Sequence, residues 1–66
     1  MKAEDMLFKE FNNNLMDCQD TGAGWFMMRV SPNYIQLFRE MFDEEYEIEY
    51  TEDIPQNLWW VKVHTC

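Results

Sequence analysis

The segment EYEIEYT, residues 45–51, alternates strictly between polar and apolar side chains, and the rest of the chain is interpreted around it. Successive side chains of a β-strand point to opposite faces, so this pattern predicts a strand with one buried face. The apolar members would face a core and the acidic members would face away: Tyr46, Ile48 and Tyr50 on one side, Glu45, Glu47 and Glu49 on the other.

The flanking sequence predicts two more strands. LWWVKVHT, residues 58–65, is apolar on both faces, which suits a central strand. EDIPQN, residues 52–57, predicts the turn that joins it to residues 45–51 as an antiparallel hairpin. WFMMRV, residues 25–30, predicts the remaining strand, and it follows DTGAG, residues 20–24, which holds both glycines and should end a helix.

Two helices complete the prediction. The first covers residues 3–18, where apolar side chains recur at spacings of three and four: Leu7, Phe8, Phe11 and Leu15. The second begins at the Ser31-Pro32 pair, which is typical of a helix start, and runs to about residue 44. Its apolar stripe contains Ile35, Phe38, Met41 and Phe42.

This element order, α-β-α-β-β, predicts an α+β fold in a single small domain of residues 1–66. The sheet would be three-stranded and mainly antiparallel, in the order 1-3-2, with both helices on one face. A parallel pairing of the first two strands is the alternative. A chain of 8.1 kDa buries only about 60% of its unfolded surface, so a partner or a homodimer would add stability.

Two short helices cannot cover both faces of the sheet, so one face should be open. Alternation places on it three residues from the first strand and three from the last: Trp25, Met27 and Arg29, and Trp60, Lys62 and His64. An error of one residue in the register would instead place the tryptophans in the core. If they are exposed, they form an apolar patch of the kind that marks an interface.

The net charge of −8 comes from 13 acidic and 5 basic residues. Nucleic acids and anionic membranes are therefore not expected as direct partners, whereas a basic protein is. Cys18 and Cys66 show no disulfide spacing, which favours free thiols in a reducing compartment. With no apolar run near 18 residues and no signal-peptide pattern, the sequence predicts a cytoplasmic protein.

Acidic residues are concentrated in residues 42–53, where seven of the twelve side chains are carboxylates: Asp43, Glu44, Glu45, Glu47, Glu49, Glu52 and Asp53. One interpretation is a protective edge, because charge along an edge strand prevents aggregation. The other is mimicry of a nucleic-acid backbone. Alternate strand residues place carboxylates about 6.6 Å apart, whereas one DNA strand carries a charge every 3.4 Å or so. Mimicry therefore requires the acids outside the strand to join the same surface.

Catalytic and metal-binding motifs are weak. DTGA, residues 20–23, resembles the active-site signature of retroviral-type aspartic proteases, but DCQ precedes the aspartate where that family has apolar residues. His64 with Glu47 or Glu49 lacks the ligand spacing of a metal site. We therefore expect no enzyme activity, no metal and no cofactor.

In size, charge and lack of catalytic groups, the chain is similar to the small acidic proteins that phages and mobile elements make against host nucleic-acid machinery. That similarity implies an inhibitor, a DNA mimic with an anti-defence or anti-CRISPR role. It would dock on a basic nucleic-acid-binding protein through the seven acids of residues 43–53, with Trp25 and Trp60 adding apolar contact. The alternative is a structural or regulatory homodimer that uses the aromatic face, its acids serving only solubility.

Overall fold

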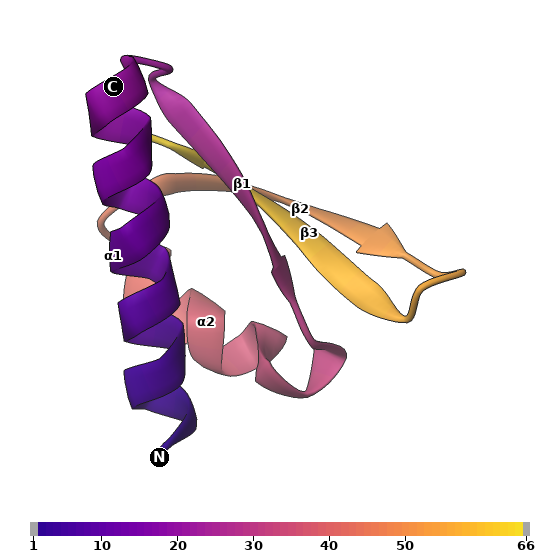
Figure 1. Cartoon of the computed structure of the whole chain (residues 1–66). Helices are drawn as coiled ribbons and strands as arrows, with labels where there is room; N and C mark the ends of the chain where they lie inside the picture. Colours follow the sequence, from indigo (N-terminus) through magenta and orange to yellow (C-terminus); the bar gives the residue numbers. More distant parts are fainter. Residues whose placement is uncertain (1, 66) are drawn as a thin grey trace.

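A computed structural model describes residues 2–65 and shows a two-layer α+β fold, with two helices against one face of a three-stranded sheet (Figure 1). Along the chain, its elements are α1 (Ala3–Thr21), β1 (Trp25–Val30), a 3₁₀ turn (Pro32–Tyr34), α2 (Ile35–Phe42), β2 (Glu47–Asp53) and β3 (Leu58–His64). The element order and fold class predicted from the sequence are confirmed.

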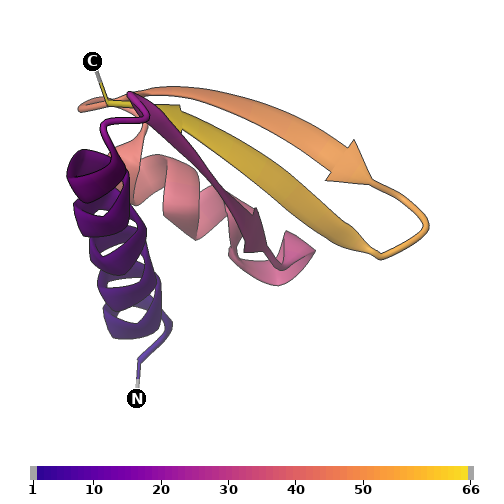
Figure 2. The ribbon, with the colours of Figure 1, turned by 45° about the horizontal axis from the view of Figure 1, so that its top comes forward.

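The sheet has the predicted order β1-β3-β2, and both pairings are antiparallel. Val61 at its centre lies opposite Met28 of β1 and Tyr50 of β2. β1 ends at Val30, opposite Trp59, so the tip of the β2–β3 hairpin projects past the end of β1 (Figure 2). Trp59, although its alternation with Val61 and Val63 places it on the core side of β3, lies beside this projecting tip and is only half-buried.

β2 begins two residues later than predicted and also ends two residues later. Tyr46 remains half-buried on the helix side, but Glu45 lies in the turn that follows α2 instead of on the strand's outer face. The reason is local: the N–H groups of Glu45 and Tyr46 both donate to the Phe42 carbonyl, 3.2 and 3.1 Å away. These bonds wind the chain into a turn before it can extend.

α1 continues to Thr21, three residues beyond the predicted end. Gly22 ends it in the left-handed conformation at φ 70°, where the backbone N–H groups of Gly22 and Ala23 donate to the carbonyls of Gln19 and Cys18. Glycine suits this position because it has no Cβ to clash. The DTGA segment is therefore a helix terminus, as its glycine predicts.

α2 is shorter than predicted. A 3₁₀ turn occupies residues 32–34, and the α-helix proper ends at Phe42 instead of residue 44. Neither helix in the described part of the chain combines the length and apolar composition needed to cross a membrane.

The core lies between the helices and the inner face of the sheet, and Phe11 of α1 is at its centre. The Phe11 ring stacks on Phe42, with centroids 3.9 Å apart and planes 5° from parallel, and meets Phe26 edge-on at 5.2 Å. Phe38 of α2 and Val63 of β3 are also fully buried. Phe8, predicted to share this core, is instead 55% exposed. Successive residues of an α-helix are about 100° apart, so the Phe8 side chain lies to one side of the apolar stripe of Leu7 and Phe11, which faces the sheet.

Candidate partner-binding surface

β2 is an edge strand whose backbone is partly unpaired. The Thr65 N–H donates to the Gly24 carbonyl, so these two residues form a hydrogen-bonded pair at the end of the β1–β3 ladder. Hydrogen-bonded and non-hydrogen-bonded pairs alternate along an antiparallel ladder, so this bond shows which residues of β3 direct their backbone groups at β1 and which direct them at β2. By that alternation, the backbone groups of Ile48, Tyr50 and Glu52 point away from the sheet. One side of β2 is therefore able to meet another molecule.

The seven acids lie along this edge but not on one face. Glu47 and Glu49 extend from the open face of β2, whereas Glu52 extends from the opposite face by alternation. The other acids lie at the two ends of the strand: Asp43, Glu44 and Glu45 in the turn before it, and Asp53 at its last position. Six of the seven side chains are exposed, and Asp53 is half-buried.

Asp53 is held by hydrogen bonds within the molecule. Trp60 Nε1 donates to one carboxylate oxygen at 3.1 Å, and the Gln56 N–H approaches the other at 3.4 Å. Both bonds tie the hairpin turn to the open face. Asp53 therefore helps to form the surface and has less freedom to bind a partner.

Asp43 is also engaged, at the other end of the run. It accepts a 3.1 Å hydrogen bond from the Tyr50 hydroxyl. Burial of the phenol, followed by this bond and the nearby charge of Asp43, raises the pKa of Tyr50 to about 12. The exposed acids without such a bond are Glu44, Glu45, Glu47, Glu49 and Glu52.

The cations of the sheet lie over aromatic rings instead of beside carboxylates. Lys62 Nζ is 4.5 Å from the centroid of the Trp25 ring, although Glu49 lies directly opposite Lys62 in the register. Arg29 of β1 lies over the Trp60 ring at 5.8 Å, and Arg39 of α2 reaches the sheet to lie over the Tyr50 ring at 4.4 Å. Within residues 2–65, the one ion-pair contact joins His64 Nε2 to Glu49 Oε2 at 3.5 Å, and it is charged only when the imidazole is protonated. The acidic edge is thus left largely unneutralised.

Trp25 and Trp60 both lie on the open face, as the sequence predicts. Trp25 is 44% exposed and Met27 beside it is 45% exposed. Trp60 is half-buried, because Arg29 covers its ring and Asp53 accepts from its indole N–H. Trp60 is one strand away from the acids of β2, whereas Trp25 is two strands away.

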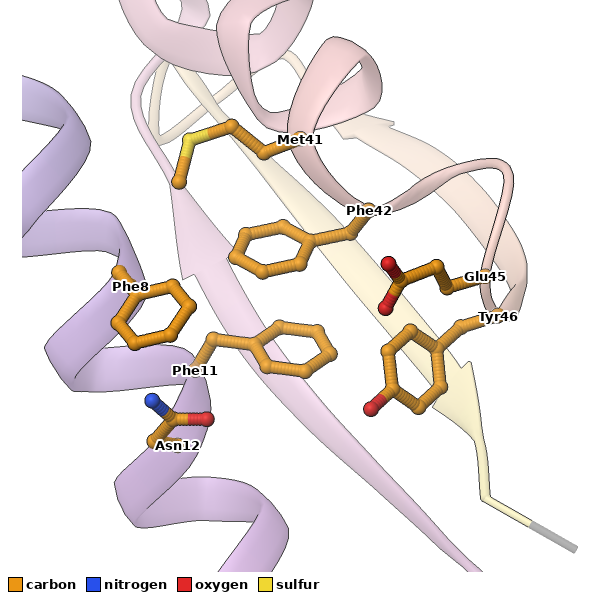
Figure 3. A pocket seen from close by; sticks show the side chains of 7 residues that line it. All are labelled: Phe8, Phe11, Asn12, Met41, Phe42, Glu45 and Tyr46. Carbon is orange, nitrogen blue, oxygen red and sulfur yellow. The ribbon is translucent and has the colours of Figure 1, made fainter.

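A groove that the sequence analysis did not identify lies between α1, the end of α2 and the turn after it (Figure 3). Its floor is the stacked pair Phe11 and Phe42. Its walls come from both helices and the turn: Phe8, Asn12, Met41, Glu45 and Tyr46. The sequence signal for this groove was Phe8, a further aromatic side chain next to the apolar stripe of α1.

The described part of the chain has no cluster of metal-ligating side chains, and its one cysteine is buried. No three His, Cys, Asp or Glu side chains of residues 2–65 lie close enough together to bind a metal ion. The Cys18 thiol is buried and donates to the Trp25 carbonyl at 3.1 Å, while Cys66 lies outside the described residues.

Comparisons with family models, with curated proteins and with solved structures gave no match to this chain.

Proposed function

We propose that this chain is a small acidic binding protein that docks its β2 edge on a basic, nucleic-acid-binding surface of another protein and thereby excludes the nucleic acid. The observation that supports this most is the unneutralised run of carboxylates. Residues 40–53 contain eight acids and no lysine or arginine, and the nearest cations lie over aromatic rings. A surface of this kind attracts basic partners and repels nucleic acid.

When all acids of β2 are counted, the spacing of charge along the edge is closer to that of a nucleic-acid backbone than the spacing of Glu47 and Glu49 alone. β2 carries four acids, and at a rise of about 3.3 Å per residue its seven positions span roughly 20 Å. This is one charge per 5 Å or so, against about 3.4 Å for one DNA strand. The three acids of the preceding turn extend the same edge. Because the acids come from both faces of β2, a partner would enclose the edge instead of lying flat on the sheet.

A protective role explains part of the same pattern. Charge on an edge strand blocks pairing with another sheet, and the unpaired backbone of β2 needs such protection. That role does not require the acids of residues 43–45, which precede the strand. The docking proposal accounts for both groups.

The biological setting that fits this surface is inhibition of host nucleic-acid machinery by a protein from a phage or mobile element. Restriction, CRISPR-type and transcription proteins all present basic grooves to nucleic acid. The open face adds Trp60 as an apolar contact beside the acids, preorganised by its hydrogen bond to Asp53 and by the Arg29 guanidinium over its ring.

A competition assay tests the proposal. A candidate partner is bound to labelled DNA or RNA, this protein is added in rising amounts, and the fraction of bound nucleic acid is measured at two salt concentrations. We expect displacement that weakens steeply with salt, because exposed charges are screened beyond roughly 8–10 Å near physiological ionic strength.

The double variant Glu47→Lys, Glu49→Lys should lose this displacement, mainly through slower association. The matched control is Glu10→Lys, Asp17→Lys, which changes the net charge by the same amount on the exposed side of α1. Equal loss in both variants would mean that net charge alone acts, and no loss in either would contradict docking through β2.

A second candidate function is self-association through the open face, which the exposure of Trp25 and Met27 favours. Sedimentation at micromolar concentration would then show a species of twice 8.1 kDa. Trp25→Ser should abolish that species, whereas a monomer at all concentrations would exclude this function.

A further inference from the structure

The groove between α1 and α2 adjoins the start of the acidic edge, because Glu45 of the turn before β2 lines it, and it has a volume of about 410 Å³. This is at the lower end of the roughly 300–1,000 Å³ typical of ligand pockets. The groove is open to solvent, so its occupant enters from the surface.

The floor of the groove is apolar and closely packed. Phe11 and Phe42 stack with their centroids 3.9 Å apart, and Tyr46 tilts against Phe11 at 5.1 Å. Phe8 forms one wall and remains 55% exposed. An aromatic ring of this exposure beside a preformed apolar floor is typical of a surface that gains stability when an apolar group covers it.

The rim of the groove is acidic. The Glu45 carboxylate lies beside the rings of Phe42 and Tyr46 (Figure 3). No lysine or arginine of residues 2–65 lines the groove. The complementary occupant is therefore an apolar group with positive charge next to it.

We propose that this groove receives one large apolar side chain of a partner protein, flanked by lysine or arginine residues whose cations face Glu45. The inference rests on the proposed function for the partner's basic character. It adds a second, apolar anchor that would slow dissociation of the partner, whereas the charges act mainly on the rate of association.

The experiment uses three capped peptides as probes: Lys-Lys-Phe-Lys-Lys, Lys-Lys-Gly-Lys-Lys and Ser-Ser-Phe-Ser-Ser. Each is titrated into ¹⁵N-labelled protein while amide chemical shifts are recorded. We expect the first peptide to shift the signals of Phe8, Asn12 and Tyr46 in a saturable manner, and the other two to bind there at least fivefold more weakly. Equal binding of the glycine peptide at these residues would overturn the proposal, as would no binding of the first peptide.

Variants separate the groove from the edge. Phe8→Ala and, independently, Glu45→Gln should each weaken the first peptide at least fivefold at the groove. Met16→Ala is the control, because Met16 is 63% exposed on the same helix but does not line the groove. The double variant Glu47→Lys, Glu49→Lys should leave the groove shifts intact. If it abolishes them while Phe8→Ala does not, the peptide binds the edge and the groove proposal is wrong.

Discussion

The two edge strands of the sheet contribute different things to the molecule. β1 directs Phe26, Met28 and Val30 into the core, and all three are buried. β2 has no buried residue, and its inward side chains Ile48 and Tyr50 are only half-buried. In exchange, β2 carries four acidic residues, whereas β1 carries one charge, that of Arg29. The two edges of the sheet thus differ, with the buried side chains on β1 and most of the charge on β2.

The largest expected effect is a difference in the free energy of unfolding that is lost when an inward side chain is truncated in β1 or in β2. Phe26→Ala should lower the free energy of unfolding by about 3–5 kcal/mol, because it leaves a cavity beside Phe11. Ile48→Ala should cost only about 1–2 kcal/mol, because half of that side chain is already solvated. Urea unfolding followed by circular dichroism measures both. Equal costs would mean that β2 is as much a part of the core as β1.

A smaller effect is expected at the hairpin turn. Asp53→Ala removes the acceptor of the Trp60 indole N–H and of the Gln56 N–H, so it should cost about 1–2 kcal/mol. Glu52→Ala, at the adjacent exposed position, serves as the control and should cost less than about 0.5 kcal/mol. If the two variants unfold alike in urea, Asp53 does not organise the turn.

The contact between β2 and the end of α2 predicts a pH dependence. The pKa of Tyr50 is raised to about 12 in the folded state, against about 10 in the unfolded chain. Between these values the folded state retains a proton that the unfolded state loses, so this stabilisation is complete below pH 10 and is lost as the pH rises toward 12. Tyr50→Phe should flatten this decline, which thermal unfolding at several alkaline pH values would reveal. A parallel decline in the variant would exclude Tyr50 as its source.

The smallest expected effect on stability is that of the charges proposed to bind. Glu47→Lys with Glu49→Lys should change the free energy of unfolding by less than about 0.5 kcal/mol, because both side chains are exposed and lysine is tolerated on edge strands. Urea unfolding of the double variant checks this. A loss of several kcal/mol would show that the glutamates support the fold, and the contrast between the two edges would fail.

The arrangement of strands was predictable because the alternation of residues 46–50 shows which face of β2 is buried, and the apolar residues on both faces of β3 suit a central strand. The exact start of β2 was not, since Glu45 continues the alternation even though the end of α2 draws it into a turn. Phe8 fits the helical spacing, but its exposure depends on how far α2 reaches across α1. The position of Lys62 was also beyond sequence reasoning, because Trp25 and Glu49 are both within its reach and only the packed face decides between them.

The most direct test of the central claim is capture of a candidate basic partner by immobilised protein, followed by elution with nucleic acid. We expect the wild-type protein to retain the partner at low salt and DNA or RNA to release it. The Glu10→Lys, Asp17→Lys control should behave in the same way, and the Glu47→Lys, Glu49→Lys variant should retain none. Retention by the edge variant at the wild-type level, or retention that nucleic acid cannot reverse, would contradict docking of the β2 edge on a nucleic-acid-binding surface.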